Sequence, residues 1–305
     1  MQTLILQSLA TSFLFIFIAP HFAGTETGHC ASSVMTYDKT LVCKNIPGLS
    51  RCRYPQFKGL RHQRKINALV KAKVKREVKS FLATKPDDRY SAYCEVTTMG
   101  GGILSIVLKF RNLDTKAIDG YSCINLNTRT YQSLNLDDLL DHDLGSREVF
   151  SILVLEQFSK KKLEFAPSLL VSELYADRAN LEKFSLSKDS LTFYFNPTAV
   201  TAGALGSQQV VIPISRVKKL IGPASPLRSL YRHKLRSSID GIDSVRCERD
   251  LCNLAVQTYS RLIARDKEDS SLYGQRARWY ERLGLKDLAK RDRAREEGTS
   301  GSEKQ

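Results

Sequence analysis

Lysine and arginine crowd two stretches of the sequence, and the chemistry that this pattern suggests is the binding of anions. Residues 51–85 hold twelve Lys or Arg and one acid, Glu77, whereas residues 216–236 hold seven Lys or Arg and no acid. These stretches carry +11 and +7, so the rest of the chain carries −3 of the total of +15. Charge concentrated in this way can attract an acidic protein or an anionic polymer. The alternative is a solvated basic surface that only favours solubility.

The first basic stretch also has the periodicity of an amphipathic helix. Between residues 61 and 82 apolar residues recur every three or four positions, namely Ile66, Leu69, Val70, Val74, Val78 and Phe81. The basic residues fall on the opposite arc. With the second stretch, the expected binding face comprises Arg64, Lys65, Lys71, Lys75, Arg76, Lys79, Lys218, Lys219, Arg232, Lys234 and Arg236. Glu77 follows Lys73 by four positions, which predicts a local ion pair rather than a catalytic carboxylate.

The cysteines form a second group of reactive residues: Cys30, Cys43, Cys52, Cys94, Cys123, Cys247 and Cys252. In an oxidising compartment Cys43–Cys52 and, between neighbouring strands, Cys94–Cys123 are candidate disulfides, although the sequence does not fix the connectivity. Cys247 and Cys252 are also candidates, provided that Cys247 lies outside a regular helix. The rival interpretation is a zinc site. Because there is no pair of CxxC units and no histidine nearby, we expect neither a metal site nor another cofactor.

Other motif-like features are better explained by structure than by catalysis. The triplet Gly100-Gly101-Gly102 leads from one predicted strand to the next, which indicates a hairpin turn rather than a phosphate-binding loop. The acidic stretch 133–145 lacks the ligand pattern of a calcium loop and predicts the start of a helix; its members are Asp137, Asp138, Asp141, His142 and Asp143. No Ser, Cys or His lies in a nucleophile motif such as GxSxG. These patterns favour a binding protein over an enzyme.

The N-terminus predicts export. Residues 4–20 are mostly apolar and include the run from Phe13 to Ala19, and small residues follow around Ala23 to Thr25. A run of this length is typical of a secretory signal, so we assign residues 1–25 to a signal peptide and expect a periplasmic or extracellular protein. No Lys or Arg precedes the run, so an uncleaved anchor is the alternative. Contact with a membrane would then be limited to this segment.

The remaining elements predict an α+β fold with a mixed or antiparallel sheet packed with helices. A cysteine-containing, irregular lead-in is expected at 26–53 and a folded domain at 54–221. Within that domain, alternation and turn signals predict strands at 90–97, 103–111, 118–126, 184–187, 191–195 and 209–214, with a helix at 147–162. Residues 222–246 read as a basic linker and 298–305 as a disordered tail.

One motif in this domain is specific enough to suggest a family. It runs from Phe184 to Pro197 (FSLSKDSLTFYFNP) and continues, after a small-residue loop, from Gln209 to Ser215 (QVVIPIS). The motif and the order of elements over 54–221 resemble the extracytoplasmic domain of RsiV-type anti-sigma factors and of some peptidoglycan deacetylases, of the domain-of-unknown-function 3298/4163 type. The resemblance implies a domain that binds ligands of the cell envelope.

Neither branch of that family transfers its activity to this chain. In the anti-sigma branch the ligand is lysozyme, but this chain carries +15, and like charges across an interface cost several kcal/mol. The deacetylase branch would add a catalytic domain with an Asp and two His on zinc, whereas no two histidines here have ligand spacing.

Residues 247–297 resemble about one and a half tetratricopeptide repeats. Aromatic and small residues fall at the expected helical positions, which predicts a C-terminal α-helical hairpin repeat; a plain capping hairpin is the alternative. The residues expected to dock a partner there are Tyr259, Tyr273, Arg276, Trp279 and Tyr280.

Three functions remain to be weighed. We expect a non-catalytic, exported protein that recognises an acidic envelope protein or an anionic glycan, in one form an inhibitor or immunity protein against a wall-targeting enzyme. The alternative is a wall-polysaccharide-modifying enzyme or its accessory subunit. Nucleic acid is not expected as a partner, because the basic stretches contain few aromatic residues for base stacking.

Overall fold

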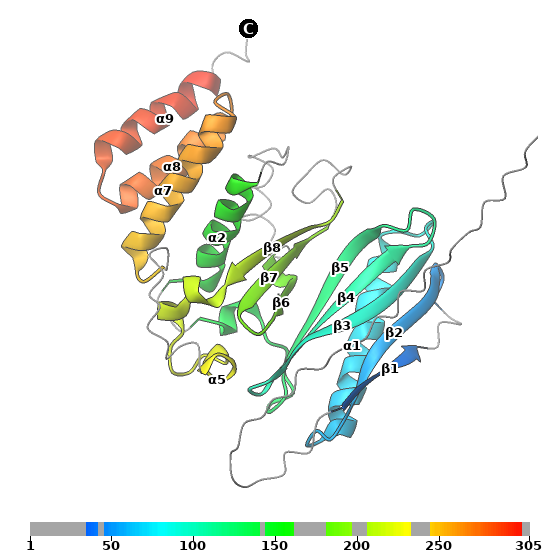
Figure 1. The fold of residues 1–305 in the computed structure, drawn as a ribbon. Coiled ribbons are helices and arrows are strands. Elements are labelled where there is room, and N and C mark those ends of the chain that lie inside the picture. Colours follow the sequence, from blue (N-terminus) through cyan, green and yellow to red (C-terminus); the bar gives the residue numbers. More distant parts are fainter. Residues whose placement is uncertain are drawn as a thin grey trace, which may run out of the picture. The chain divides into compact units, whose positions relative to one another are not determined.

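Two β-sheets, each with a helix against one face, organise the chain. The structure is a computed structural model that describes residues 35–41, 46–140, 144–161, 181–196, 206–232 and 245–300; for residues 35, 299 and 300 it describes the backbone only. Figure 1 labels the elements along the chain. The α+β class predicted from the sequence is confirmed. None of the helices in the described ranges combines the length and the apolar character that a membrane span requires.

The first sheet has five strands in the order β1-β2-β3-β4-β5: β1 (Met35–Leu41), β2 (Leu49–Lys58), β3 (Tyr90–Gly100), β4 (Ile103–Asn112) and β5 (Ile118–Asn127). All neighbours are antiparallel except β2 and β3, which are parallel. The prediction of an irregular lead-in at 26–53 is therefore wrong for β1 and the first half of β2. Pro55 fits inside β2 because the pairing with β3 ends at Arg53, so no N–H is needed on that side.

Helix α1 (Gln63–Ala83) covers one face of this sheet. Its apolar stripe is buried, as predicted, at Ile66, Val70, Val74 and Val78, and Leu82 extends it. Phe81 stacks on Phe110 of β4 with ring centroids 3.8 Å apart. The buried stripe fixes the rotation of α1 and leaves its other arc in solvent.

Strand β4 is buried on both faces. Its even-numbered residues, from Leu104 to Phe110, pack in the α1 core, whereas Ile103, Ser105 and Val107 face the other way. On that second face the Ser105 hydroxyl donates to Asn125 Oδ1 at 2.7 Å and accepts from Leu186 N–H at 2.9 Å. Buried polar groups that are hydrogen-bonded in this way fix the position of β6, and with it the second sheet, against β4 and β5.

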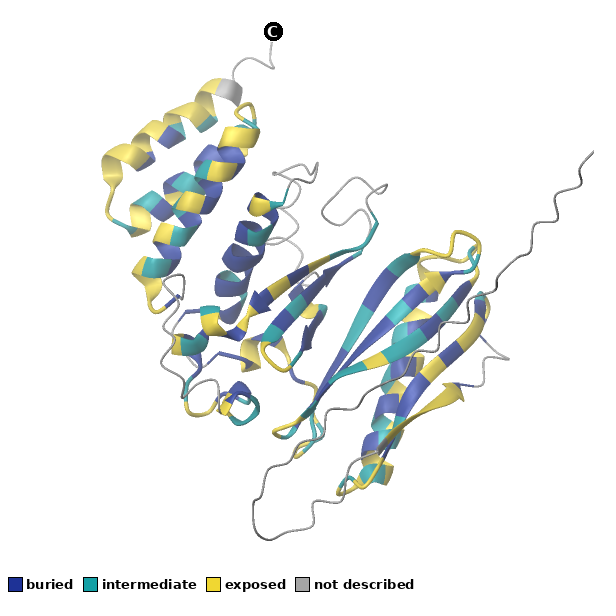
Figure 2. Ribbon diagram, viewed as in Figure 1, coloured by how far each residue is buried: buried dark blue, intermediate teal, exposed yellow. Residues whose placement is uncertain are grey.

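The second sheet consists of β6 (Phe184–Leu186), β7 (Ser190–Phe195) and β8 (Gln208–Pro213), all antiparallel. Helix α2 (Ser146–Lys160) packs against it and is buried around nearly its whole circumference, as Figure 2 shows. A helix that is apolar all round needs cover on every side. Here the cover on the side away from the sheet comes from α7 (Glu248–Arg265).

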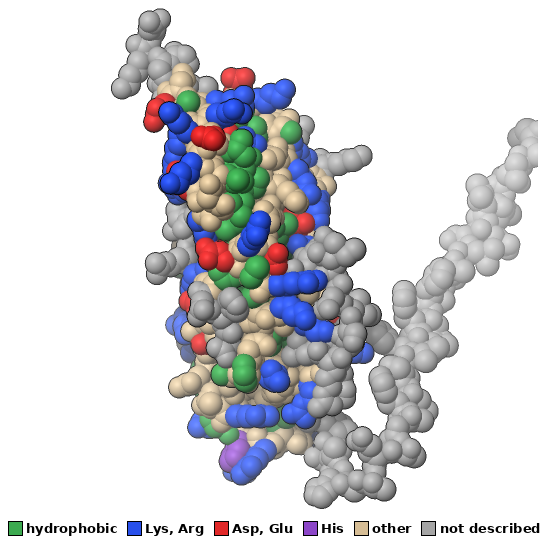
Figure 3. All heavy atoms as spheres, turned by 90° about the vertical axis from the view of Figure 1, so that its left-hand side faces the viewer, with side chains coloured by type: hydrophobic (Ala, Val, Ile, Leu, Met, Phe, Trp, Pro, Cys, Tyr) green, Lys and Arg blue, Asp and Glu red, His purple; other side chains and the backbone are tan. Residues whose placement is uncertain are grey.

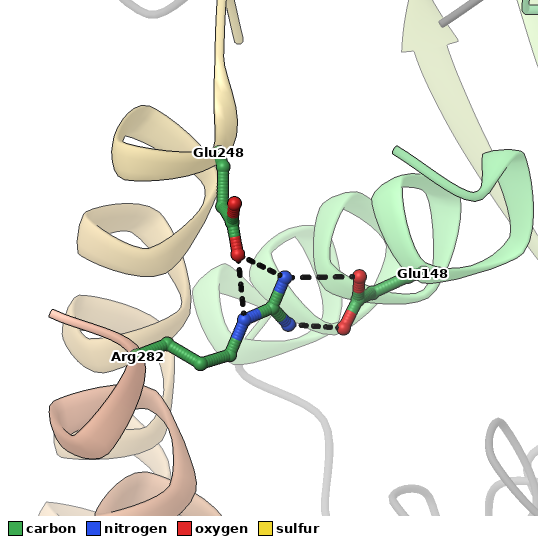
Figure 4. A network of polar contacts seen from close by, with 3 residues as sticks. All are labelled: Glu148, Glu248 and Arg282. Atoms are coloured by element: carbon green, nitrogen blue, oxygen red, sulfur yellow. Dashed lines mark hydrogen bonds and ion pairs between the residues drawn. The ribbon is translucent and has the colours of Figure 1, made fainter. Parts of the chain in front are cut away.

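Three C-terminal helices follow, α7, α8 (Ser270–Arg282) and α9 (Lys286–Ser300), each packed on the next. Apolar residues of α7 and α8 share one core with α2 and the second sheet, so this part is not a separate domain. Figure 4 shows an ionic junction in which Arg282 of α8 binds Glu148 of α2 and Glu248 of α7. The helices are present as predicted, while their tetratricopeptide character stays a prediction.

The first half of the expected linker is part of the fold. After the single turns η3 (Ile214–Arg216) and η4 (Lys218–Leu220), the short helix α5 (Leu227–Leu230) places Leu227 and the following Tyr231 in the core, both essentially unexposed. Residues 222–232 therefore do not form a flexible linker, because apolar residues anchor them. The rest of the segment, to residue 244, lies outside the described residues.

Candidate functional site

A basic cleft of about 1050 Å³ lies where the tip of the first sheet meets the segment after the second sheet. Four parts of the chain line it: the hairpin tip at 101–103, the loop 127–134 after β5, Asp138 of the turn η1 (Leu136–Asp138), and residues 218–232 around α5. The hairpin tip and the loop 127–134 meet because β3 ends, β4 begins and β5 ends at the same end of the sheet, where Ile103 pairs with Gly100 and Asn127. We refer to this feature as the basic cleft.

The charge of the lining is almost entirely positive. Among the residues that the structure describes, five cationic residues line the cleft against one acid, Asp138, and they are Arg129, Lys218, Lys219, Arg228 and Arg232. Asp138 accepts the Asn135 N–H at 2.8 Å, which engages part of its carboxylate within its own turn. Arg129, Arg228 and Arg232 are exposed and form no ion pair with any acid in the described ranges. The cleft can therefore offer several guanidinium groups to a carboxylate, sulfate or phosphate ligand.

The wall between the hairpin and α5 depends on a close backbone approach. Gly101 has φ +59°, and a Cβ at this position would lie 2.8 Å from Leu230 N and 2.9 Å from Leu230 Cα. The Ser229 hydroxyl donates to the Gly101 carbonyl oxygen. Thus the hairpin turn predicted from the glycine triplet is confirmed, and its middle residue also holds α5 in place.

The opposite wall is a loop stabilised by its own hydrogen bonds. Asn127 Oδ1 accepts the N–H groups of Arg129 and Thr130 at 2.9 and 3.2 Å. Tyr131 N–H donates to the Asn127 carbonyl oxygen at 2.8 Å. Side-chain capping of this kind fixes a tight turn, so Arg129 projects from an ordered support.

The same loop joins the cleft to the basic face of α1. Lys73 Nζ donates to the hydroxyl of Ser133, a lining residue, at 2.6 Å. Lys65 Nζ lies 3.8 Å from the ring centroid of Tyr131. Burial, with repulsion from Arg76, lowers the pKa of Lys73 below its ordinary value. The two basic stretches of the sequence thus meet in space through loop 127–134.

The structure places the predicted basic residues in two groups. Those of α1, namely Arg64, Lys65, Lys71, Lys75, Arg76 and Lys79, are all exposed on its solvent arc, as predicted. Lys218, Lys219 and Arg232 line the basic cleft. Lys234 and Arg236 lie outside the described residues. In Figure 3, Lys and Arg predominate over acids on the face drawn, at the level of α5 and below.

Two of the cationic residues that line the cleft, Arg129 and Arg228, were not in the predicted set. Arg228 belongs to the second basic stretch, so the charge count pointed to it, although it was not selected. Arg129 is a single arginine in a turn and gave no signal, because its role depends on a fold that brings residues 129 and 228 to one cleft.

The predicted partner-docking residues are mostly part of the core. Tyr259, Tyr273 and Trp279 are 0%, 7% and 4% exposed, so a partner could not reach them without unfolding the helices. Arg276 forms a two-pronged ion pair with Asp292, at 2.7 and 2.8 Å, and its guanidinium carbon lies 5.6 Å from the Tyr280 ring centroid. These residues hold α7, α8 and α9 together.

The expected Cys94–Cys123 disulfide is wrong. These residues are on β3 and β5, which are not neighbours but flank β4. Cys94 lies opposite Leu108 and Cys123 opposite Val107. Successive residues of a strand point to opposite faces, so the two thiols lie on different sides of the sheet, and both are free.

The other cysteine pairs have different outcomes. Cys247 is the residue preceding α7, outside the helix as a bond would require, yet both Cys247 and Cys252 are free thiols. Cys43 lies outside the described residues, as does Cys30, so the pairing of Cys43 with Cys52 stays a prediction.

The acidic residues singled out in the sequence have local structural roles. Glu77 pairs with Arg76 at 2.9 Å, not with Lys73, and accepts from the Ser122 hydroxyl at 2.7 Å. Asp137 pairs with Arg147 at 3.1 Å. The predicted helix start at 133–145 is the single turn η1, and Asp141, His142 and Asp143 lie outside the described residues.

Comparison with known proteins identifies the domain class. Residues 137–215 match the family model DUF3298, a protein family of unknown function. The chain therefore carries a DUF3298 domain, which confirms the resemblance inferred from the closing hairpin. The matched segment contains the last two residues of η1, all of α2 and the second sheet. Of the residues that line the basic cleft, it includes Asp138.

Two solved structures of the DUF3298 family are similar to this chain. One, from Bacteroides fragilis, is 16% identical, covers 66% of this chain and 96% of its own, and has a TM-score of 0.41. The other, from Pseudomonas aeruginosa, is 12% identical, covers 64% of this chain and 97% of its own, and has a TM-score of 0.39. No curated protein matches the sequence.

Proposed function

We propose that this chain is an exported, non-catalytic binding protein of the cell envelope that captures an anionic partner in the basic cleft. The observation that carries the proposal is the described lining of the cleft, in which five cationic residues and one acid surround a space of about 1050 Å³. A cleft of this size, slightly above the usual ~300–1,000 Å³ range of ligand sites, holds more than a single ion. Export rests on the apolar N-terminal run.

The chemistry of the lining supports binding rather than turnover. Acid–base or nucleophilic catalysis needs a nucleophile, a base and an orienting group within reach of each other. In the described ranges, the lining residues are arginine, lysine, amide, hydroxyl and apolar side chains, with one carboxylate that accepts a hydrogen bond within its own turn. Arginine and lysine side chains attract an anion by their charge and donate hydrogen bonds to its oxygens.

A matched set of charge reversals tests the proposal. The cleft variant changes Arg129, Arg228 and Arg232 to Glu; the control changes Lys286, Lys290 and Arg291 of α9 to Glu, three exposed positions with the same total change in charge. We expect the full chain to bind heparin or poly-glutamate in calorimetric titration, and the affinity to fall steeply between about 0.05 and 0.5 M salt. The cleft variant should lose this binding, while the control keeps most of it.

Two results would refute the proposal. One is equal binding by the cleft variant and the α9 control, because the basic cleft would then contribute nothing beyond net charge. The other is the release of a product from a wall polymer by the purified chain, since that would make the protein an enzyme, which is the alternative function.

A further inference from the structure

We infer that the occupant of the basic cleft is a flexible, linear acidic glycan whose chain continues over loop 127–134 onto the basic face of α1. This inference rests on the proposed function and specifies its ligand. A folded acidic protein is the competing occupant, and the two make different demands on the surface.

The hydrogen-bonding groups of the cleft suit a ligand rich in acceptors and hydroxyls. Besides its five cations, the described part of the lining offers the side chains of Asn127, Thr130, Gln132 and Ser133. Of the anionic or carbonyl acceptors there, Asp138 accepts from Asn135 and the Gly101 carbonyl accepts from Ser229, so both are already engaged within the protein. A carboxylated or sulfated sugar chain provides anionic oxygens for the guanidinium groups and hydroxyls for the neutral side chains.

The lining lacks what a protein partner would need. Protein interfaces depend on buried aromatic or apolar anchors that fill complementary pockets, with about 800 Å² buried on each partner. Among the described residues, no Phe, Tyr or Trp lines the cleft; Ile103, Leu134 and Ile221 are buried in the fold, and the apolar side chains that remain, those of Pro223, Ala224 and Pro226, are small. A concave cationic site without such anchors fits a narrow chain better than the surface of a folded protein.

The path beyond the cleft is given by two contacts. Ser133 binds Lys73, and Tyr131 lies against Lys65, so the far side of loop 127–134 is in contact with α1. From Lys65 to Lys79 the exposed basic arc of α1 extends for about 21 Å at the ~1.5 Å rise of a helix. Lys71, Lys75 and Lys79 are exposed on this arc and have no ion pair within the described ranges. A short ligand would fill the cleft alone, whereas a long one would reach both surfaces.

Ligands of increasing length distinguish binding in the cleft from binding along α1. The probes are heparin fragments and oligogalacturonates of increasing length, with poly-glutamate as the acidic peptide, titrated against the full chain. Three variants with equal charge change are compared: Arg129, Arg228 and Arg232 to Glu in the cleft; Lys71, Lys75 and Lys79 to Glu on α1; and Lys286, Lys290 and Arg291 to Glu on α9. Circular dichroism confirms that each variant is folded.

Affinity should rise with glycan length and then level off once the chain spans cleft and helix. The cleft variant should bind every fragment at least ~100-fold more weakly, whereas the α1 variant should weaken only the long fragments, by about tenfold, and leave the short ones unchanged. The α9 control should follow the wild type. If one glycan chain binds the cleft and α1 together, the α1 variant must lose affinity only for fragments above a threshold length.

The failures of the two proposals are distinguishable. Poly-glutamate binding as tightly as the acidic glycans, or an α1 variant that weakens short and long fragments alike, would overturn the glycan inference while leaving an anion-binding cleft. If the cleft variant binds every probe as the α9 control does, the proposed function itself fails.

Discussion

The replacement of Gly101 by alanine tests whether the wall of the basic cleft depends on a close backbone contact. Gly101 combines a left-handed φ of +59° with a Cβ direction that would run into Leu230 N at 2.8 Å and Ser229 C at 3.0 Å. These obstacles are backbone atoms, so α5 must move to make room. Its neighbour Gly100 ends β3 with nothing within 4 Å of an added Cβ, which makes Gly100→Ala a matched control.

The magnitude follows from three contributions. Holding an alanine in the left-handed region costs about 1 kcal/mol, at the lower end of the usual ~1–2 kcal/mol. Displacing α5 removes the bond from Ser229 to the Gly101 carbonyl, which contributes about 1 kcal/mol. Loosening the packing of Leu227 and Tyr231 adds about 1 kcal/mol. We therefore expect Gly101→Ala to lower the unfolding free energy by about 3 kcal/mol, and Gly100→Ala to change it by less than about 1 kcal/mol.

Urea unfolding measures this difference. The single tryptophan of the chain, Trp279, is 4% exposed and shares a core with Leu227 and Tyr231, so its fluorescence reports on the affected region. Affinity for a heparin fragment, measured on the folded variants, should fall for Gly101→Ala only. Equal midpoints for the two variants would refute the reasoning, because they would show that the hairpin and α5 do not touch as described.

Two further predictions concern the core and the thiols. Glu156 is 4% exposed in its side chain and pairs with Arg216 at 3.0 Å and with Lys160. Burial alone would raise the pKa of Glu156, but Lys160 and Arg216 outweigh burial and lower this pKa. The ionised Glu156 carboxylate therefore stabilises the folded state above the ordinary pKa, and this stabilisation is lost as the pH falls through the lowered pKa of the folded protein. Glu156→Gln should therefore lower the unfolding free energy by about 3 kcal/mol at pH 7, with a smaller difference from wild type in acid; equal urea midpoints at both pH values would contradict this. Burial raises the pKa of the Cys94 and Cys123 thiols, whereas Cys247 is exposed. Iodoacetamide should therefore label Cys247 of the folded chain well before Cys94 and Cys123. Mass spectrometry of the labelled peptides measures the order of labelling.

Local patterns explain which elements the sequence could reveal. The strands β3, β4 and β5 follow one another through short turns, and the buried stripe of α1 has helical spacing, so each could be predicted from its own residues. Strands β1 and β2 were not predicted; just before and within β2, Pro47, Gly48 and Pro55 are typical of irregular chain. Their place depends instead on the parallel pairing of β2 with β3, with all of α1 in between.

The candidate site, like the fold, could be predicted from the sequence only in part. The charge of residues 216–236 predicted an anion-binding surface, and three of the selected residues do line the cleft. Which basic residues face one another could not be predicted, because Arg129 joins them only through the hairpin and loop at the end of the first sheet. Likewise, the side of β4 on which each cysteine lies depends on register, where a shift by one residue exchanges the two faces.

The stretch that marks the domain and the stretches that line the cleft scarcely overlap. The recognisable segment, residues 137–215, builds α2 and the second sheet, while the guanidinium groups come from before and after it. Swapping the side chains at 129, 228 and 232 would leave that scaffold intact, so proteins sharing it could differ widely in the charge that they present at this position. Ligand preference in such proteins is thus better compared through these flanking positions than through the signature segment itself.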